Sequence, residues 1–385
     1  MLPSIAEEAG GVSEGVIQSS LKLIDCGLKV YIATLDDSLP ELFPIGSIKA
    51  FSFGSGFFKY RYNYHLAQGL SKIINTYSID LVVIEGLWQY HSYCARKERA
   101  KYGLPYLVFT HGMLDPWFKR AYPLKHLKKW VYWPWADYRV LRDASAVLFT
   151  TEQERLLARQ SFWLYKANEV VVGYGTSSPP ADAERQREAF LSRFPHLRGE
   201  PILLFLSRIH PKKGVDLLIE AFAAVADRDP RLQLVIAGPD QVGLQAALQQ
   251  RAIELGIADR ITWPGMLSGE LKWGAFRCAE LFCLPSHQEN FGVVVAEALA
   301  CGLPVAIAEP VNISAEVSAV QAGLVHADTV EGTTEALRQW LAMAPAARAE
   351  MGECGKQLFV ERFDFASVAR NLLPVLKDAV HPLSI

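Results

Sequence analysis

The chain has 385 residues, half of them hydrophobic and 21% charged, and this length favours two domains over a single core. A formal net charge of −2 creates no general attraction for nucleic acid, so we expect no such partner. The six cysteines lack the spacing of a zinc site or a disulfide framework. Because no apolar run reaches the roughly 18 residues of a membrane span and no signal peptide is recognisable, we expect a cytoplasmic protein.

Short apolar runs alternate with helical periodicity along the chain. The first half predicts helices at 12–26, 62–76, 88–101 and near 124–142, and strands at 28–34, 48–53, 81–84, 106–110, 146–150 and 170–172. The second half predicts strands at 202–206, 232–237, 261–263, 281–284, 305–307 and 323–325, and helices at 214–226, 241–255, 268–277, 291–301, 330–343 and 346–361. This alternation is typical of an α/β fold, here with two Rossmann-like, doubly wound domains that face a cleft.

A Ser/Pro-rich stretch at 174–182 separates the two halves. We therefore expect an N-terminal domain at 1–175, a linker at 176–198 and a C-terminal domain at 199–362, followed by an amphipathic helix within 363–385. Residues 1–180 contain 20 Lys and Arg against 16 Asp and Glu, so the positive excess lies in the first half.

Two glutamates, Glu289 and Glu297, flank the junction between a predicted buried strand and a predicted helix. Free backbone N–H groups and the helix dipole make such a junction suitable for an anion. The residues at the turn are Asn290, Phe291, Gly292 and Val293. Eight residues of helical rise span about 12 Å, which exceeds the roughly 5–9.5 Å between the acid and base of a glycosidase. We expect the carboxylates to contact different parts of one ligand, although a helix cap and a solvated residue would explain the spacing alone.

A basic turn at 207–214 follows another predicted strand and opens a helix. Arg208 can bind two phosphate oxygens with its planar guanidinium, and Lys213 can add a compact positive charge. A solvated surface turn is the simpler interpretation of this motif taken alone. Gly10 and Gly11 precede the first predicted helix and allow a ligand to approach the backbone closely, although many Gly-Gly pairs are mere bends.

His111 and Asp115 follow the predicted strand at 106–110, at the edge of a parallel sheet where ligands usually bind. Asp115 is a candidate for acceptor contact and equally for helix capping. Residues 117–135 then contain five Lys and Arg, seven aromatic residues and no acid. Such a segment suits an anionic membrane surface, each cation contributing about 1 kcal/mol, but it equally suits a helix whose aromatic side chains pack into the domain.

These motifs resemble, in order over nearly the whole chain, those of retaining family 4 glycosyltransferases of the GT-B fold, of the sort that builds envelope or extracellular polysaccharide. The resemblance rests on Gly10-Gly11, His111, Arg208 with Lys213, Gly265-Met266, and Glu289 with Glu297. It implies that the last helix crosses back onto the first domain. It also implies that neither a metal nor a cofactor is used, and the sequence contains no Asp-x-Asp motif.

The resemblance further implies a role for each motif. Arg208, Lys213, Glu289 and His111 would act in catalysis, the two cations on the diphosphate and Glu289 on the sugar hydroxyls. Donor binding would involve Gly11, Gly265, Met266, Glu297 and the turn at 290–293. Gly10 and Asp115 would contact the acceptor. The expected donor is a UDP-sugar, with glucose favoured, and the expected acceptor is a glycan or a polyprenyl-diphosphate-linked glycan. Peripheral contact with the inner face of the membrane is an option that segment 117–135 leaves open.

Two other functions are compatible with the motifs. A UDP-sugar epimerase on the same fold would need no acceptor, and a noncatalytic nucleotide-sugar-binding partner would need no reacting groups. The sequence also departs from the family, because only Met1–Ile5 precede the glycine loop where a full strand is expected. We expect either that the natural chain begins further upstream or that this central strand is short, and we expect the missing apolar cover to impair folding.

Overall fold

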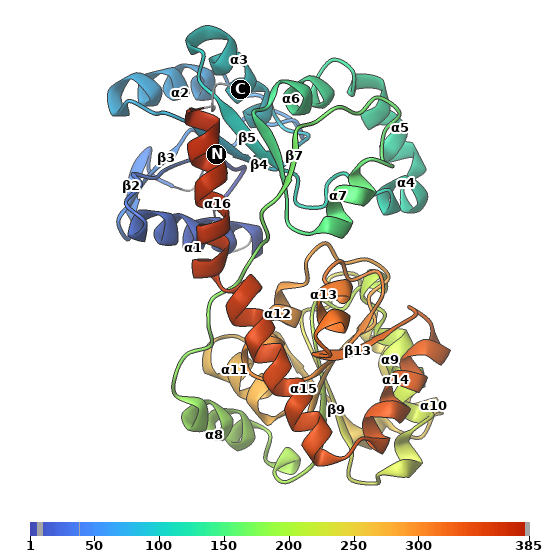
Figure 1. The fold of residues 1–385 in the computed structure, drawn as a ribbon. Coiled ribbons are helices and arrows are strands. Elements are labelled where there is room, and N and C mark those ends of the chain that lie inside the picture. The colour runs from blue at the N-terminus through green and yellow to red at the C-terminus, as the bar shows by residue number, and fades with distance from the viewer. Residues whose placement is uncertain (6–10, 38, 382–385) are drawn as a thin grey trace. The chain divides into compact units, whose positions relative to one another are not determined.

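The computed structural model describes residues 1–5, 11–37 and 39–381, and the chain forms two compact units. Unit 1 comprises Met1–Gly175 and Phe365–Ile385, and unit 2 comprises Thr176–Asp364 (Figure 1). Each unit is an α/β structure built on parallel strands. No described helix is both long and apolar enough to cross a membrane.

Unit 1 contains two sheets, ordered β1-β3-β2 and β4-β5-β6-β7. The strands are β1 (Tyr31–Thr34), β2 (Leu42–Ile45), β3 (Ile48–Ser52), β4 (Val82–Glu85), β5 (Tyr106–Phe109), β6 (Ala146–Phe149) and β7 (Glu169–Val171). The helices are α1 (Gly11–Asp25), α2 (Tyr64–Tyr77), α3 (Tyr90–Tyr102), α4 (Trp117–Ala121), α5 (Pro123–Tyr132), α6 (Asp137–Asp143), α7 (Glu152–Ala158) and α16 (Phe365–Val380). All pairings are parallel except the β2–β3 hairpin.

The first three residues connect the two sheets of unit 1. The Met1 nitrogen donates to the Val83 carbonyl at 2.6 Å, and the Glu85 N–H donates to the Met1 carbonyl at 2.8 Å. On the other side, the Leu2 N–H donates to the Ala33 carbonyl at 3.1 Å. These residues therefore pair like a very short central strand between β1 and β4.

Helices cover both faces of the β4–β7 sheet, as burial on alternate sides requires. Val108 packs into a core with Leu66 of α2, whereas Leu107 and Phe109 pack into a core with Leu372 of α16. Helix α16 also packs against α1 (Figure 1). Parallel strands buried on both faces have nearly continuous apolar sequences, which is why they are recognisable in the chain.

The long helix predicted near 124–142 is wrong, because α5 ends at Tyr132 and α6 begins at Asp137. Pro134 lies between them and lacks the N–H that would continue the helix, while its ring would clash with the preceding turn. Trp133 at this break is fully buried and stacks on Phe162 with ring centroids 4.1 Å apart. The buried contact between Trp133 and Phe162 therefore lies where the chain passes from α5 to α6.

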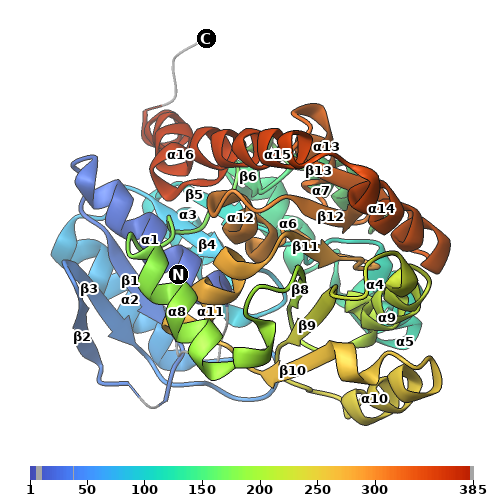
Figure 2. The same cartoon turned by 90° about the horizontal axis from the view of Figure 1, so that it is seen from below.

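Unit 2 has one parallel sheet of six strands in the order β10-β9-β8-β11-β12-β13 (Figure 2). They are β8 (Ile202–Leu206), β9 (Gln233–Ala237), β10 (Ile261–Gly265), β11 (Leu281–Leu284), β12 (Val305–Ala308) and β13 (Gly323–His326). The helices are α8 (Ala183–Arg193), α9 (Val215–Ala223), α10 (Gln245–Glu254), α11 (Gly269–Cys278), α12 (Val293–Ala300), α13 (Ser314–Ala319), α14 (Val330–Ala342) and α15 (Pro345–Leu358). Figure 2 shows α8 beside α11, with which it packs.

Candidate active site

The carboxyl edge of the unit 2 sheet brings most of the predicted donor residues together. The chain runs from β8 outward to β9 and β10, then returns to place β11 on the other side of β8. The strand order therefore reverses between β8 and β11, and ligands of open parallel sheets bind at this kind of reversal. The loop after β8 carries Arg208 and Lys213, and the loop after β11 carries Glu289 and Gly292.

Lys213 and Glu289 form an ion pair at this reversal point. The Lys213 ammonium donates to Oε2 of Glu289, and the lysine side chain is 8% exposed against 20% for the glutamate. Lys213 is held in a 3₁₀ turn at Pro211–Lys213, whose N-cap is His210. The next residue, Gly214, approaches the Pro285 carbonyl so closely that a Cβ would lie 2.1 Å from its oxygen. The basic turn is therefore fixed against the β11 loop.

Gly292 shapes the start of α12. Its φ of +79° lies in the left-handed region, and a Cβ there would lie 3.2 Å from a Val295 methyl and 3.3 Å from Cγ of Glu289. The helix begins at Val293. Its first backbone N–H groups, which have no acceptor within the helix, therefore directly follow the loop that carries Glu289. Phe291 is buried with its ring against Phe363, the centroids 5.3 Å apart, so its side chain packs inside unit 2 and is not presented to a ligand.

The late start of α12 corrects one argument about the glutamate pair. Residues 289–292 precede the helix, so the 12 Å estimated from eight residues of helical rise does not apply. Glu297 lies about one turn into α12 and is buried. Lys272 of α11 donates to its Oε1 at 2.7 Å, and Thr176 provides a further side-chain hydrogen bond. Burial raises the pKa of Glu297, and these partners oppose that shift.

The remaining predicted donor residues of unit 2 lie on the loops after β8 and β10. Arg208 is exposed, and its Nη1 donates to Gln241 at 3.2 Å. Gly265 ends β10 with a φ of +72°, and its carbonyl accepts the Gly238 N–H at 2.8 Å. Met266, which follows, is 74% exposed. A strongly exposed Met side chain next to backbone groups offers a surface on which a planar ring can stack.

In unit 1, His111 is paired with a glutamate that the sequence did not indicate. His111 Nε2 lies 2.6 Å from Oε2 of Glu85, the last residue of β4, and both side chains are nearly buried. The His111 ring stacks on Phe109 and meets the edge of Tyr174. With a φ of +45°, His111 adopts the left-handed conformation that non-glycine residues rarely occupy and that often marks functional sites.

A second buried glutamate, Glu154 of α7, holds the His111 loop in place. Its Oε1 accepts the Thr110 hydroxyl at 2.6 Å and the Gly112 N–H at 2.5 Å. Its Oε2 accepts both the N–H and the hydroxyl of Thr150, at 2.7 and 2.6 Å. One carboxylate therefore ties the ends of β5 and β6 together on both sides of His111.

Three remaining candidates from the sequence belong to unit 1: Asp115, the pair Gly10 and Gly11, and the segment 117–135. Asp115 is buried and accepts the N–H of Trp117, the first residue of α4, at 2.7 Å. Gly10 lies outside the described residues, and Gly11 is the first residue of α1. The segment 117–135 divides: Trp133 is buried, but several apolar side chains of α5 and its neighbours are exposed.

Two family models match the chain. The model for "Glycosyl transferases group 1" matches residues 186–358, and the model for "Glycosyl transferase 4-like domain" matches residues 21–175. The chain belongs to the family 4 glycosyltransferases.

This glycosyltransferase is similar to curated D-inositol 3-phosphate glycosyltransferases. The relative from Saccharomonospora viridis is 33% identical over 259 residues, covering 63% of this chain and 58% of the relative. The relative from Nocardia farcinica is 34% identical over 198 residues, covering 49% of this chain and 43% of the relative. The matched region thus spans about half the length of these relatives.

Solved structures share the fold of the glycosyltransferase. Sucrose-phosphate synthase from Thermosynechococcus elongatus has a TM-score of 0.77 at 20% identity, covering 96% of this chain and 93% of the other. HepE from Anabaena, in complex with UDP and glucose, has a TM-score of 0.72 at 17% identity and 98% coverage of both chains. The fold is therefore GT-B, as the resemblance implied.

Proposed function

We propose that the protein transfers a hexose, with glucose favoured, from a UDP-sugar to a glycan or lipid-linked acceptor with retention of configuration. The observation that carries this proposal is the meeting of Lys213, Glu289 and the start of α12 at the strand-order reversal of unit 2. A cation and free N–H groups suit a diphosphate, and an adjacent carboxylate suits sugar hydroxyls. This pairing of charges matches the junction between the phosphate and the sugar of the donor.

UDP-glucose is supported by the names of the structural neighbours. HepE was solved with UDP and glucose, and the neighbour described as "Trehalose-6-phosphate from E. coli" was solved with UDP-2-fluoro glucose. In this chain, the loop with Gly265 and Met266 would contact the uracil, and Glu297 would accept the ribose hydroxyls. Because Glu297 already binds Lys272, we propose that the lysine keeps the carboxylate ionised and oriented for that contact.

The charge changes during transfer determine which residues act. As the bond between C1 and the phosphate oxygen breaks, negative charge grows on the β-phosphate and positive charge on the sugar ring. Arg208, Lys213 and the α12 N–H groups would stabilise the departing diphosphate most strongly at that moment. The acceptor hydroxyl would attack C1 from the same face, and its proton would pass to the departing phosphate oxygen, which retains the configuration. We propose that no metal ion takes part.

His111 would contact the sugar or the acceptor. Its Nε2 is engaged by Glu85, so Nδ1 is the ring atom left to face a ligand. Glu85 would therefore fix the orientation of the ring, and Glu154 would fix the loop that carries it.

Two classes of acceptor suit the proposed reaction. A role in envelope or extracellular polysaccharide synthesis follows from the family resemblance, whereas the curated relatives are named for D-inositol 3-phosphate. Both acceptors carry hydroxyls near anionic groups, which agrees with the positive excess of the first half of the chain. D-inositol 3-phosphate therefore belongs in the acceptor panel beside polyprenyl-diphosphate-linked glycans.

Helix α5 supports contact with an anionic membrane surface. Leu124, Leu127 and Val131 are 77%, 58% and 67% exposed, and their spacing places them on one face of the helix. Lys125 and Lys128 are exposed on the same helix. We propose that this apolar face inserts among headgroups of the inner membrane face while the lysines bind anionic lipid.

The membrane contact is tested by sedimentation with vesicles of phosphatidylglycerol and phosphatidylcholine. Binding should be strong at low salt and weaken with salt, and Leu127→Glu should abolish it while the thermal midpoint stays unchanged. Absence of binding by the unmodified protein at low salt would remove the membrane role without affecting the transfer reaction.

The transfer reaction is tested by incubating the protein with UDP-sugars, first alone and then with acceptors. Release of UDP together with a glycosylated product supports transfer, and the anomeric coupling in the product's proton NMR spectrum tests retention. Conversion of the sugar without an acceptor would indicate the epimerase, and binding without turnover would indicate the noncatalytic partner. Full activity after treatment with EDTA is expected if no metal takes part.

A further inference from the structure

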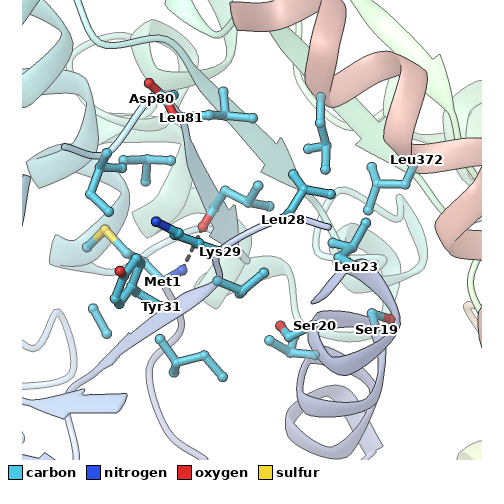
Figure 3. Close-up of a pocket in the computed structure, with 18 of the residues that line it drawn as sticks. Met1, Ser19, Ser20, Leu23, Leu28, Lys29, Tyr31, Asp80, Leu81 and Leu372 are labelled. Atoms are coloured by element: carbon cyan, nitrogen blue, oxygen red, sulfur yellow. Dashed lines mark hydrogen bonds between the residues drawn. The ribbon is translucent and has the colours of Figure 1, made fainter. Parts of the chain in front are cut away.

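The chain passes between its two units twice, at residues 175–176 and at residues 364–365. On the unit 1 side, both passages lead to one cavity of about 710 Å³. Tyr174 lines this cavity just before the first passage. Leu372 of α16 lines it after the second passage (Figure 3). Both side chains are buried, so unit 1 holds the two passages through its interior.

On the unit 2 side, the two passages bind each other. The Thr176 N–H donates to the Phe363 carbonyl at 2.9 Å, and Thr176 forms a parallel β-bridge with Asp364. Ser178 adds a hydrogen bond from its hydroxyl to Oδ2 of Asp364 at 2.8 Å. The first residue of unit 2 is thus hydrogen-bonded to the segment with which the chain leaves this unit.

The paired residues Thr176 and Phe363 also contact the start of α12, where the proposed function places the donor. The Phe363 ring packs against Phe291, which lies in the turn before the helix. The Thr176 side chain forms a hydrogen bond with Glu297, about one turn into the helix. Thr176 is 7% exposed, so this hydrogen bond is shielded from solvent.

Thr176 and Lys272 hold the Glu297 carboxylate from separate segments of the chain. Lys272 of α11 donates to Oε1 at 2.7 Å, and the Glu297 side chain is 8% exposed. An ionised carboxylate has about four positions that accept hydrogen bonds, so these two donors leave room for the hydroxyls of a ribose. Because the donors come from different elements, they restrict rotation of the carboxylate and fix the direction in which its remaining lone pairs point.

We propose that Thr176 is a positioning residue of the donor site, whose hydroxyl orients the Glu297 carboxylate toward the ribose hydroxyls. This role rests on the proposed function, because that function assigns the ribose to Glu297. A threonine suits the role, since its hydroxyl donates a hydrogen bond without adding a second positive charge to that of Lys272. The pairing of the two passages uses the backbone of Thr176, so the side-chain role can be removed separately.

Calorimetry with UDP and with dideoxy-UDP, which lacks both ribose hydroxyls, tests this role. The unmodified protein should bind UDP at least about tenfold more tightly than dideoxy-UDP, because hydrogen bonds to an ionised group are strong. Thr176→Val keeps the shape of the side chain and the backbone N–H but removes the hydroxyl. It should weaken UDP binding about five- to tenfold and leave dideoxy-UDP binding within about twofold of normal. Thr176→Ser should restore the affinity for UDP.

The matched control is Thr333→Val in α14. Thr333 is also buried, and its hydroxyl donates to the Thr329 carbonyl at 2.8 Å, in a helix that carries none of the proposed donor residues. This variant loses the same hydroxyl from the same unit and should keep both affinities unchanged. Thr176→Ala, which is smaller than threonine, should show the same selective loss as Thr176→Val if the valine side chain disturbs the fold.

An unchanged preference for UDP over dideoxy-UDP in Thr176→Val would overturn the positioning role and leave the proposed function intact. Equal weakening of both ligands would also overturn it, because a general disturbance of unit 2 does not distinguish the ribose hydroxyls. Failure of the unmodified protein to bind UDP would instead overturn the proposed function and this role together.

Discussion

Replacement of Lys213 by alanine should weaken diphosphate binding and slow transfer. The lysine is nearly buried and paired with Glu289, so its removal has two effects. Loss of one preorganised cation from the departing diphosphate should reduce kcat by about 10²–10³-fold, the cost of removing one oxyanion donor. Loss of the partner of Glu289 should also destabilise the fold, by less than the roughly 3–5 kcal/mol of a fully buried pair, because Glu289 is 20% exposed.

A double-mutant cycle with Glu289→Gln separates these effects. Calorimetry should show UDP binding at least about tenfold weaker in Lys213→Ala, since a charge-assisted hydrogen bond contributes about 1.5–3 kcal/mol. Glu289→Gln should bind UDP as tightly as the unmodified protein or more tightly, because it releases the lysine for phosphate, yet it should slow transfer. Lys212→Ala removes the same charge from the same turn and serves as the control.

The cycle also contains the result that would refute this reasoning. If Lys213 acts only by neutralising Glu289, the double variant will bind UDP and turn over like Glu289→Gln alone. Unchanged UDP affinity in Lys213→Ala, with a normal unfolding midpoint, would likewise remove the lysine from the donor site.

Four further predictions concern Arg208, Glu85, Asp137 and Gly292. Arg208→Ala should lower kcat about 10²–10³-fold, and a loss below threefold in steady-state kinetics would exclude a catalytic role. Glu85→Gln should lower kcat/KM about tenfold through loss of one charge-assisted hydrogen bond to His111, worth about 1.5 kcal/mol, and activity within twofold of normal would contradict the pairing. Burial raises the pKa of Asp137 to about 6 from 3.8, so stability should fall by about 3 kcal/mol as the pH rises from about 4 to above 6. Urea unfolding at pH 4.5 and 7.5 should show about 2 kcal/mol of this loss. Asp137→Asn should remove it, and an unchanged pH slope in the variant would count against that carboxyl as its source. Gly292→Ala should cost about 1–2 kcal/mol in thermal unfolding, because its backbone is left-handed, and a neutral effect would show that the turn can relax.

The sequence predicted the parallel α/β fold and most strands, because buried strands are short apolar runs bounded by polar turns. It did not predict β2 (Leu42–Ile45), whose residues are exposed or only partly buried and whose run contains Pro44. It joined α5 and α6 into one helix, since the helical periodicity continues through Pro134. Local pattern alone does not reveal that a buried tryptophan turns the chain there.

The candidate site was predicted only where motifs are local. Arg208 and Lys213 lie five residues apart, so one turn reveals both. Glu85 and His111 come from different strands, and their pairing depends on β4 lying beside β5. Glu154 and Lys272 likewise reach their partners from separate helices. These contacts cannot be predicted from the spacing of residues along the chain, because they depend on which strands and helices are neighbours in the fold.

The strand order of unit 2 has a consequence for altering substrate preference. The loop after β10, with Met266, and the loop after β11, with Glu289, leave the same sheet edge three strand spacings apart, about 14 Å. On the proposed function, recognition of the base and handling of the hexose would therefore fall to well-separated parts of one scaffold. Exchanging the β10 loop should redirect nucleotide choice while the groups that grip the saccharide stay untouched, so the two preferences can be engineered, and can diverge in nature, one at a time.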